Sequence, residues 1–375
     1  MANDKDFVIK NAIEVGADTK VTLGTISSSD IDLATGNYFA DTLSANTTYT
    51  ISNAGGVQSF QLEVTGGLVS SWNVNSASYV RDLRVSSYQT YPTGIYFKPD
   101  GTKMYITGLG TYSVDEWDLS TAWDISTASY NQEINLGGGL TQPKGLFFKP
   151  EGDKLYIPDS SGDDINEYTL STSWDISTAA YSQSFSVSSQ DTSPTSVFLK
   201  PDGTKMYVLG DSGNDVNEYD LSTAWDISTA SYSQNFSVSG QETELQGLFF
   251  KYDGTKMYVL GEGGDDVNEY DLSTAWDIST ASYGESFSIA SQEAEPQGIY
   301  IAPTGGKMYI IGRDNDKVYQ YVLESAATIT WPSSIEWAGG VAPSAPASGE
   351  TDVFTIVTDD GGTSYVGVKT ADNLS

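Results

Sequence analysis

The most regular feature of the chain is a block of short apolar segments that recurs at a constant interval along its middle two-thirds. In one block, apolar and polar residues alternate over 181–187, and apolar runs follow at 197–199, 206–209 and 216–221. Alternation with period two is typical of a half-buried strand, and a short apolar run between turn residues is typical of a fully buried strand. The pattern therefore predicts four short strands per block and no long helix.

Tryptophan marks the interval, because five tryptophans lie 51 residues apart at Trp72, Trp123, Trp174, Trp225 and Trp276. The segments Lys-Met-Tyr or Lys-Leu-Tyr that begin at 103, 154, 205, 256 and 307 keep the same interval. Four-stranded units of this length predict a β-propeller of five blades. A linear β-solenoid is the alternative, although its rungs are normally shorter.

The two ends of the array predict how the ring closes. The array opens with a single strand within 72–85 and ends with three strands that finish at Leu323. Joining these pieces completes the fifth blade and removes the exposed sheet edges. Residues near 70 and 324 are then expected to lie side by side.

The sequence on either side of the array predicts a second domain in two pieces. Alternating strands are expected at 48–52 and 58–64 before the array, and at 327–332, 352–357 and 363–368 after it. Neither flank has enough strands for a stable sandwich, but together they do. A closed propeller returns the chain to its starting point, so it can be inserted in a loop of another domain.

We therefore predict an all-β chain in which a five-bladed β-propeller, with four strands per blade, is inserted in a small antiparallel β-sandwich. In this arrangement Val64 and Thr328 are expected on adjacent strands. The predicted parts are an N-terminal attachment segment at 1–30, the split sandwich at 31–67 plus 326–375, and the propeller at 68–325.

Composition excludes several function classes. The chain of 375 residues carries 18 Lys plus Arg against 50 Asp plus Glu, a net charge of −32. Such a charge disfavours nucleic acid, whose binding depends on Lys and Arg, and we expect no nucleic-acid partner. The absence of Cys and His removes thiolate nucleophiles, the usual general base and the usual zinc ligands. The chain start resembles no signal peptide, and no segment is apolar enough to span or insert into a membrane.

Acidic turns between apolar runs offer oxygen ligands, and Ca²⁺ is the metal that such ligands suit. Their spacing matches no EF-hand loop, and Asp, Asn and Gly also favour turns that bind no metal. Solvated turns are thus the simpler interpretation, without any cofactor. The candidate calcium ligands are Asp159, Asp163, Asp211, Asp215, Asp265, Asp314 and Asp316.

The loops before the first apolar run of each block differ most between copies, and in a propeller they converge on one face. Aromatic, amide and carboxylate side chains suit a carbohydrate, and paired carboxylates roughly 5 to 9.5 Å apart suit glycoside hydrolysis. Similar acids at equivalent positions are also expected of inert duplicated loops. The candidate ligand-binding residues of this rim are Tyr88, Tyr91, Gln142, Asp191, Glu242, Glu244, Glu293 and Glu295.

The motif Lys-Pro-Asp-Gly-Thr-Lys-Met-Tyr-Val at 200–208, with variants at 98, 149, 251 and 302, resembles the turn and strand of bacterial propellers of the YVTN and TolB type. The resemblance covers 72–324. It implies the fold but not one function, because such propellers include binding scaffolds and sugar-lactone hydrolases.

The flanks carry a second resemblance. Asn46 to Asn53 with Phe60 to Val64, followed by 329–337 and 359–365, looks like a domain of tail-fibre-like proteins of bacteriophages, many of them marine. The segment 5–11 is similar to their N-terminal, virion-proximal end. In those relatives the two halves are usually contiguous, so the propeller is an insertion here.

These resemblances imply a non-enzymatic virion appendage, namely a tail fibre, head fibre or decoration protein. It would be made in the host cytoplasm, contact other virion proteins, and display the propeller toward a bacterial surface glycan. The group resembled suggests a homo-oligomer and often a trimer, although no coiled-coil heptad enforces three-fold assembly here. The rival hypothesis is a propeller glycosidase or lactonase that uses carboxylates of the rim.

Overall fold

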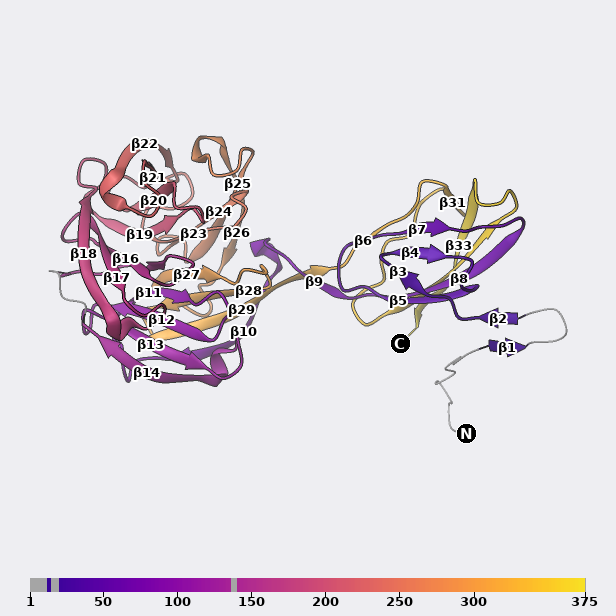
Figure 1. Cartoon of the computed structure of the whole chain (residues 1–375), viewed down its shortest axis with the longest axis horizontal. Coiled ribbons are helices and arrows are strands. Elements are labelled where there is room, and N and C mark those ends of the chain that lie inside the picture. The colour runs from indigo at the N-terminus through magenta and orange to yellow at the C-terminus, as the bar shows by residue number, and fades with distance from the viewer. Residues whose placement is uncertain (1–11, 15–19, 136–139, 375) are drawn as a thin grey trace. The chain divides into compact units, whose positions relative to one another are not determined.

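The computed structural model describes residues 12–14, 20–135 and 140–374. Within these residues the chain forms β-strands and short 3-10 turns without an α-helix, and no helix there is long and apolar enough to cross a membrane. The chain divides into two compact units (Figure 1). We call Ser70–Leu323 the repeat unit, and Met1–Val69 with Glu324–Ser375 the flanking unit.

Four-stranded antiparallel sheets recur through the repeat unit, which confirms the prediction of an all-β repeat fold of the propeller kind. Four sheets follow chain order: β11 (Pro92–Phe97), β12 (Lys103–Gly108), β13 (Ser113–Leu119), β14 (Ala128–Ile134); β15 (Phe147–Phe148), β16 (Lys154–Asp159), β17 (Asp164–Leu170), β18 (Ala179–Ser186); β19 (Pro194–Leu199), β20 (Lys205–Gly210), β21 (Asp215–Leu221), β22 (Ala230–Ser237); β23 (Leu245–Phe250), β24 (Lys256–Gly261), β25 (Asp266–Leu272), β26 (Ala281–Ser288). A further sheet combines both ends of the unit: β27 (Pro296–Ile301), β28 (Lys307–Gly312), β29 (Lys317–Ala326) and β10 (Ala77–Arg84), with the short β9 (Leu68–Ser70) also pairing with β29.

Strand β10 enters this last sheet by antiparallel pairing with β29, with Ala77 opposite Leu323 and Leu83 opposite Val318. The sheet therefore contains one strand from the start of the array and three from its end. At the same place, the Ser71 amide donates a hydrogen bond to the Leu323 carbonyl at 2.8 Å. The two ends of the repeat unit thus lie side by side.

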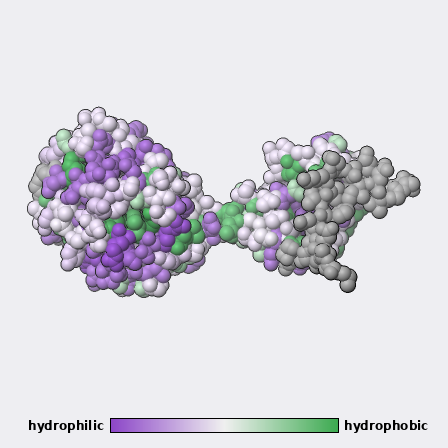
Figure 2. Space-filling view, turned by 90° about the horizontal axis from the view of Figure 1, so that it is seen from below, coloured by the Kyte–Doolittle hydropathy of each residue, from purple (hydrophilic) through white to green (hydrophobic). Residues whose placement is uncertain are grey.

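The first strand of each sheet lies near the middle of the unit, and the fourth strand lies at its periphery (Figure 1). First strands are buried along their length because they face neighbouring sheets on both sides, whereas in β18 the exposure alternates from Gln183 to Ser186. This explains why the sequence has continuous apolar runs and alternating segments. The visible surface is correspondingly mostly hydrophilic or intermediate (Figure 2).

One aromatic residue from each first strand closes the centre of the unit. The ring centroids of successive neighbours lie 5.1–5.6 Å apart with interplanar angles of 61–75°, so every contact is edge to face. Such pairs contribute about 0.5–1.5 kcal/mol each beyond area burial. The series returns to its first member, and we call it the aromatic ring: Tyr96, Phe147, Phe198, Phe249 and Tyr300.

Each tryptophan of the 51-residue interval packs on the glycine of a turn between a first and a second strand. In one copy Gly203 has φ +73°, and its own amide donates to the Lys200 carbonyl at 2.7 Å. Only glycine adopts such a φ without strain. The indole of Trp225 lies where a Cβ on Gly203 would point, at about 2.5 Å. The tryptophans are therefore packing residues of the turns.

A tyrosine hydroxyl joins each sheet to the next. In β20, the Tyr207 hydroxyl donates to the Trp276 carbonyl at 2.7 Å, although the two residues are 69 positions apart. The same bond recurs between every pair of neighbouring sheets: Tyr105 to Trp174, Tyr156 to Trp225, Tyr258 to Trp72 and Tyr309 to Trp123. Since the last two bonds link the end of the array to its start, the set of contacts is cyclic.

The flanking unit has a mixed sheet to which both flanks contribute. In strand order it contains β31 (Ile335–Trp337), β33 (Tyr365–Leu374), β32 (Thr351–Thr358), β8 (Gln58–Thr65) and β5 (Tyr38–Thr42). Its core includes Phe39, Leu62 and Phe354. The remaining strands are β3 (Ile26–Ser27), β4 (Asp30–Asp32) and β7 (Thr50–Ser52) in one sheet, β6 (Thr47–Thr48) with β30 (Ile329–Thr330), and β1 (Ala12–Glu14) with β2 (Lys20–Thr22), while β9 (Leu68–Ser70) leads into the repeat unit.

Two details of the predicted sandwich are wrong. The prediction of antiparallel strands fails because β5 pairs with β8 in parallel, as do β31 with β33 and β4 with β7. A parallel pair needs a crossover connection, and residues 43–57 supply one by forming β6 and β7 between β5 and β8. Alternation along a strand has the same form in both directions, so it does not encode this choice.

Val64 and Thr328 are also not on adjacent strands. Val64 lies opposite Asp352 and Asp41, whereas the Thr328 carbonyl accepts a hydrogen bond from the Thr47 amide at 2.9 Å. Of the predicted attachment segment at 1–30, residues 1–11 and 15–19 lie outside the described residues, and these include the stretch 5–11 that carries the resemblance. The pairing of β3 with β4 places the residues around 26–32 within the flanking unit.

Candidate functional site

Three predicted rim acids are buried and accept hydrogen bonds from backbone amides. Asp191, Glu242 and Glu293 are only 3%, 2% and 1% exposed. Asp191 accepts hydrogen bonds from the amides of Ser193 at 2.6 Å and Gly213 at 2.7 Å. One donor lies in the loop before the first strand, and the other lies in the turn after the second strand. These acids therefore link the loop before the first strand to the turn after the second strand. We call the face that carries these loops and turns the rim face: it comprises the loops before β11, β15, β19, β23 and β27 and the turns after β12, β16, β20, β24 and β28.

The other predicted rim residues divide into two places. Tyr91, Gln142, Glu244 and Glu295 occupy one equivalent position in four of the repeats, where the third repeat has Ser193, and Tyr91 is 58% exposed. Tyr88 instead lies at the periphery of its sheet, where its ring stacks on Tyr130 of β14 with centroids 3.8 Å apart and packs edge-on against Trp117. The structure thus brings the first four to the rim and separates Tyr88 from them.

The candidate calcium ligands of the acidic turns lie apart from one another in the described structure. No group of three or more acids in the described part of the chain is placed to hold a metal ion. Asp159 accepts from the amides of Thr141, Gln142 and Ser161 at 2.7–3.0 Å. The other candidates serve their turns in similar ways: Asp215 accepts from Asn217, Asp211 from Leu245, Asp316 from Tyr91 and Asp314 from Asn315, while Asp163 and Asp265 have left-handed φ values of 50° and 46°.

Charged side chains from different repeats meet on the rim face near the centre of the unit. Arg313 donates to Glu295 at 2.8 Å and forms an ion pair with Glu262 at 3.5 Å. Glu262 also accepts from the side-chain amide of Gln297. The charges of Lys144 and Asp211 interact with each other, and Lys144 also interacts with Glu262 and Arg313. We call the whole group the axial cluster: Lys144, Asp211, Glu262, Glu295, Gln297 and Arg313.

Lys144 is the distinctive member of the axial cluster. Among the described residues its amine has no carboxylate within 4 Å, although most other lysines of the repeat unit have one. Burial lowers the pKa of Lys144, and Arg313 lowers it further, while Glu262 and Asp211 oppose this change. Burial likewise raises the pKa of Glu262 against the effect of Arg313. The cluster therefore holds a half-buried amine that has hydrogen bonds to offer.

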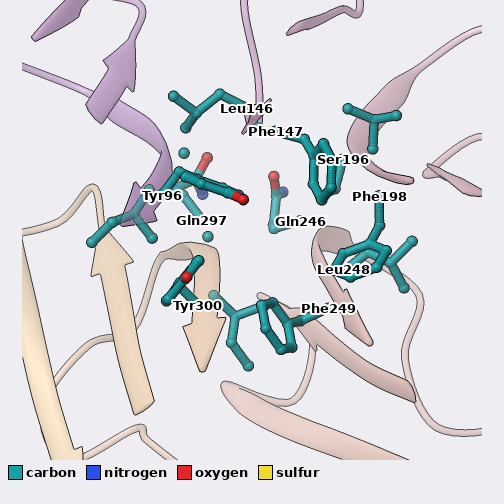
Figure 3. A pocket seen from close by; sticks show the side chains of 16 residues that line it. Tyr96, Leu146, Phe147, Ser196, Phe198, Gln246, Leu248, Phe249, Gln297 and Tyr300 are labelled. Carbon is teal, nitrogen blue, oxygen red and sulfur yellow. The ribbon is translucent and has the colours of Figure 1, made fainter. Parts of the chain in front are cut away.

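A small cavity lies next to the aromatic ring and receives two glutamines. Gln246 and Gln297 point into it beside Tyr96, and Gln297 is 1% exposed with a side-chain oxygen that has no partner in the described structure (Figure 3). The cavity volume is about 20 Å³, which is room for about one water molecule. The cavity is therefore too small for a ligand larger than water.

The repeats diverge strongly at the axial cluster and much less in the turns of the opposite face. The position of Lys144 is Thr, Lys, Thr, Gln and Gln in successive copies, and the position of Arg313 is Leu, Ser, Asp, Glu and Arg. By contrast, the turns on the opposite face keep Lys-Pro-Asp-Gly in two copies and differ at only one residue in two more. Both sets of loops are at the surface, so exposure alone does not account for the difference. Sequence reasoning did not single out Lys144, Glu262 or Arg313, because it treated the loops before the first strands and the acidic turns as two separate sites. The divergence at these positions was nevertheless visible in the repeats.

Apart from the axial cluster, Asp115 in β13 is an unusual acid of the repeat unit. Asp115 is completely buried, and neither of its carboxylate oxygens has a partner in the described structure. Three other repeats carry Asn166, Asn217 and Asn268 at this position. Burial, with a smaller contribution from Glu133 opposite it in β14, raises the pKa of Asp115 to about 7. Asp115 is therefore partly protonated at neutral pH.

This acid predicts a pH dependence of stability. The folded pKa of Asp115 is about 7 and its ordinary value is 3.8, so the folded chain binds this proton more tightly and loses stability as pH rises from about 4 to about 7. Asp115→Asn should remove this loss and raise the free energy of unfolding by about 1–2 kcal/mol at pH 8. Urea unfolding at pH 5 and pH 8 measures it, and an equal change at both pH values would contradict the prediction.

No protein-family model and no curated protein matches this sequence. Among solved structures, the chain is similar to a protein assigned as a 6-phosphogluconolactonase from Bacteroides uniformis, with 13% identity over 61% of this chain and 65% of that one and a TM-score of 0.40. It is also similar to the periplasmic gluconolactonase of Pseudomonas aeruginosa, with 14% identity over 62% and 66% of the two chains and a TM-score of 0.37. The β-propeller domain of Cps50 (Swd1) from Myceliophteria thermophila shares 11% identity over 66% of this chain and 99% of that one, with a TM-score of 0.38.

The chain spans about 65% of the length of the first of these proteins. At these identities and TM-scores the likeness transfers neither an activity nor a substrate to this chain. The functional argument therefore rests on the chain's own residues.

Proposed function

We propose that this chain is a non-enzymatic recognition protein whose repeat unit binds carbohydrate at the axial cluster. We interpret the repeat unit as a closed five-bladed β-propeller inserted in a β-sandwich, so the five repeats present their variable positions to one ligand. The observation that carries the proposal is the divergence of the repeats at the axial cluster, around an amine that has no ion pair among the described residues.

The chemistry of the axial cluster suits a saccharide. Lys144 offers donors, and Glu262 and Asp211, whose charges act on Lys144, offer acceptors. Sugar hydroxyls both donate and accept, so a few convergent polar groups of this mixed kind can fix their orientation. An acidic sugar would gain further by placing its carboxylate on Lys144.

We further propose that the flanking unit attaches the chain to a virion, as a tail fibre, head fibre or decoration protein. The support is the resemblance of its sequence to tail-fibre-like bacteriophage proteins. The partners would then be other virion proteins and further copies of the chain, in a trimer if the resembled group is followed. Labelling of intact virions with an antibody against the flanking unit tests this, and labelling confined to infected-cell extract would contradict it.

A hydrolase is the second candidate, and Glu262 is the observation that favours it. Burial raises the pKa of this carboxyl, which is a property that general acids need. Glu295 and Asp211 provide further carboxylates in the same cluster. Glycoside or lactone hydrolysis would then depend on these acids, and not on the buried Asp191, Glu242 and Glu293.

Lys144→Thr is expected to weaken glycan binding at least 10-fold, about 1.4 kcal/mol, because it removes the amine at the centre of the cluster. The backbone tolerates threonine there, since the equivalent residues are Thr93 and Thr195. The matched control is Lys149→Ala, which removes one positive charge from the opposite face, where the fifth repeat carries Ala302. An array of bacterial surface glycans, followed by calorimetry on the best ligand, measures both variants.

The outcomes separate the candidates. Retained glycan with loss in Lys144→Thr and not in Lys149→Ala supports recognition at the axial cluster. Equal affinity of both variants, or no glycan bound by the natural chain, contradicts it. Release of sugar by the natural chain, abolished in Glu262→Gln, would replace recognition by hydrolysis.

A further inference from the structure

An apolar pocket opens at the centre of the repeat unit on the face opposite the axial cluster. Its volume is about 330 Å³, within the range of small-ligand sites. Its walls come from the turns between first and second strands, which form what we call the proline face. Four of these turns contribute a proline to the pocket at equivalent positions: Pro99, Pro150, Pro201 and Pro303.

The fourth repeat breaks this pattern with Tyr252. The Tyr252 ring packs edge-on against Phe249 with centroids 5.8 Å apart, and its hydroxyl lies 3.2 Å from that of Tyr300. Tyr252 therefore covers the part of the aromatic ring that Phe249 and Tyr300 form. The pocket remains open over Tyr96 and Phe147, so one substitution converts a symmetric depression into a site with one distinct wall.

The aromatic ring forms the floor of the pocket and separates it from the axial cluster. Tyr96, Phe147 and Phe198 line both the pocket and the small cavity on the rim side. Their rings contact one another edge to face, with centroids 5.1 to 5.6 Å apart, between the pocket and the small cavity. A ligand of the proline face would therefore be independent of a ligand at the axial cluster.

Charged residues surround the mouth of this pocket on the proline face, but they form ion pairs within each turn. Lys98 forms an ion pair with Asp100 at 2.7 Å, and Lys200 does so with Asp202 at 2.8 Å. The turns that begin at Lys149 and Lys251 have comparable pairs, whereas the fifth turn has Ala302 and Thr304 and no charge. An apolar pocket whose surrounding charges are already neutralised favours a neutral ligand, because a charged one would be desolvated without a partner.

One hydroxyl is available as a donor in the pocket wall. Tyr300 is 1% exposed, and the Tyr252 hydroxyl is its hydrogen-bond partner in the described structure. When Tyr300 donates in this pair, the Tyr252 hydrogen is left to point into the pocket. Burial raises the pKa of Tyr252 to about 12, so the hydroxyl stays protonated at neutral pH.

We propose that the proline face binds a neutral small molecule with one aromatic or alicyclic ring and a hydrogen-bond acceptor. The ring rests on the aromatic floor between the prolines, and the acceptor takes the Tyr252 hydroxyl. This binding does not depend on the proposed function of the axial cluster.

Binding of benzyl alcohol, followed by saturation-transfer NMR and calorimetry on the full chain, tests the proposal. Benzoate and benzylammonium have the same ring with a negative or positive charge. We expect benzyl alcohol to bind at least 10-fold more tightly than either ion. Tighter binding of benzylammonium would overturn the proposal in favour of a cation site, and no binding of benzyl alcohol would overturn it entirely.

Variants taken from the repeats locate the site. Pro150→Tyr places in the second turn the residue that the fourth turn already carries, and it should fill the pocket and reduce affinity at least 10-fold. Pro201→Tyr does the same from the third turn if Pro150→Tyr does not fold. Tyr252→Phe should weaken binding a few-fold by removing the hydroxyl. The control is Tyr181→Phe on the peripheral strand β18, where the side chain is 44% exposed; unchanged affinity in a folded Pro150→Tyr or Pro201→Tyr variant would overturn the location.

Discussion

Gly203→Ala is expected to lower the free energy of unfolding by roughly 2–4 kcal/mol. Two effects add. The φ of +73° at Gly203 is strained for alanine, and the new Cβ would lie about 2.5 Å from the indole of Trp225. The indole cannot withdraw freely, because the Trp225 amide donates to the Gly203 carbonyl at 3.0 Å and the Trp225 carbonyl accepts from Tyr156 of the neighbouring sheet at 2.8 Å.

Urea unfolding followed by circular dichroism measures the effect, and Gly240→Ala is the matched control. Gly240 is exposed in a rim-face loop, has no left-handed φ, and nothing lies within 4 Å of its Cβ position. The control should change stability by less than about 0.5 kcal/mol. Similar losses in both variants would mean that the turn and the tryptophan do not form a rigid contact.

The periodic contacts explain how much of the fold could be predicted. The interval of Trp225 and of the glycine turn is visible in the sequence because each copy must solve the same packing problem. Strand direction in the flanking unit could not be predicted, since β5 and β8 alternate in the same way whether they run parallel or antiparallel. Parallel pairing there depends on a crossover through β6 and β7, which are only two and three residues long.

Some contacts between neighbouring sheets could have been predicted from residue pairs that change together at equivalent positions of the repeats. Between three pairs of sheets a glutamine amide donates to an aspartate, as from Gln183 to Asp226 at 2.9 Å. In the repeat that contributes β10, the glutamine is replaced by Arg81, which forms an ion pair with Asp124 at 2.7 Å. At the other side of that sheet Glu285 occupies the glutamine position and accepts from Asn75, which lies two residues beyond the position of the aspartate. Such paired changes across 51-residue positions indicate which residues meet between repeats.

The candidate site was harder to predict because burial, not residue type, decides the role of each rim acid. Asp191 and Glu244 look alike in the sequence and lie only two positions apart when their repeats are aligned. Asp191 is nevertheless buried against backbone amides, whereas Glu244 is exposed. The distinction depends on whether a carboxylate reaches the turn after the second strand. That turn comes about 20 residues later, so no local pattern reports it.

Glu242→Ala is expected to cause the largest loss of stability, about 3–5 kcal/mol. The Glu242 carboxylate is 2% exposed and accepts four backbone hydrogen bonds at 2.6–3.2 Å. Leaving a buried donor unsatisfied costs about 1–3 kcal/mol, and water entering from the rim face recovers part of the total. The four donors are the amides of Thr243, Glu244, Gly263 and Gly264.

Glu244→Ala is the matched control, because this acid is two residues away and exposed at the same rim. It should change the free energy of unfolding by less than about 0.5 kcal/mol, and Glu242→Gln should fall between the two, since the amide keeps one acceptor oxygen. Urea unfolding measures all three. If Glu242→Ala were as stable as Glu244→Ala, then Glu242 would be free for a ligand, and the recognition site would have to be extended from the axial cluster to the loops that the sequence first suggested.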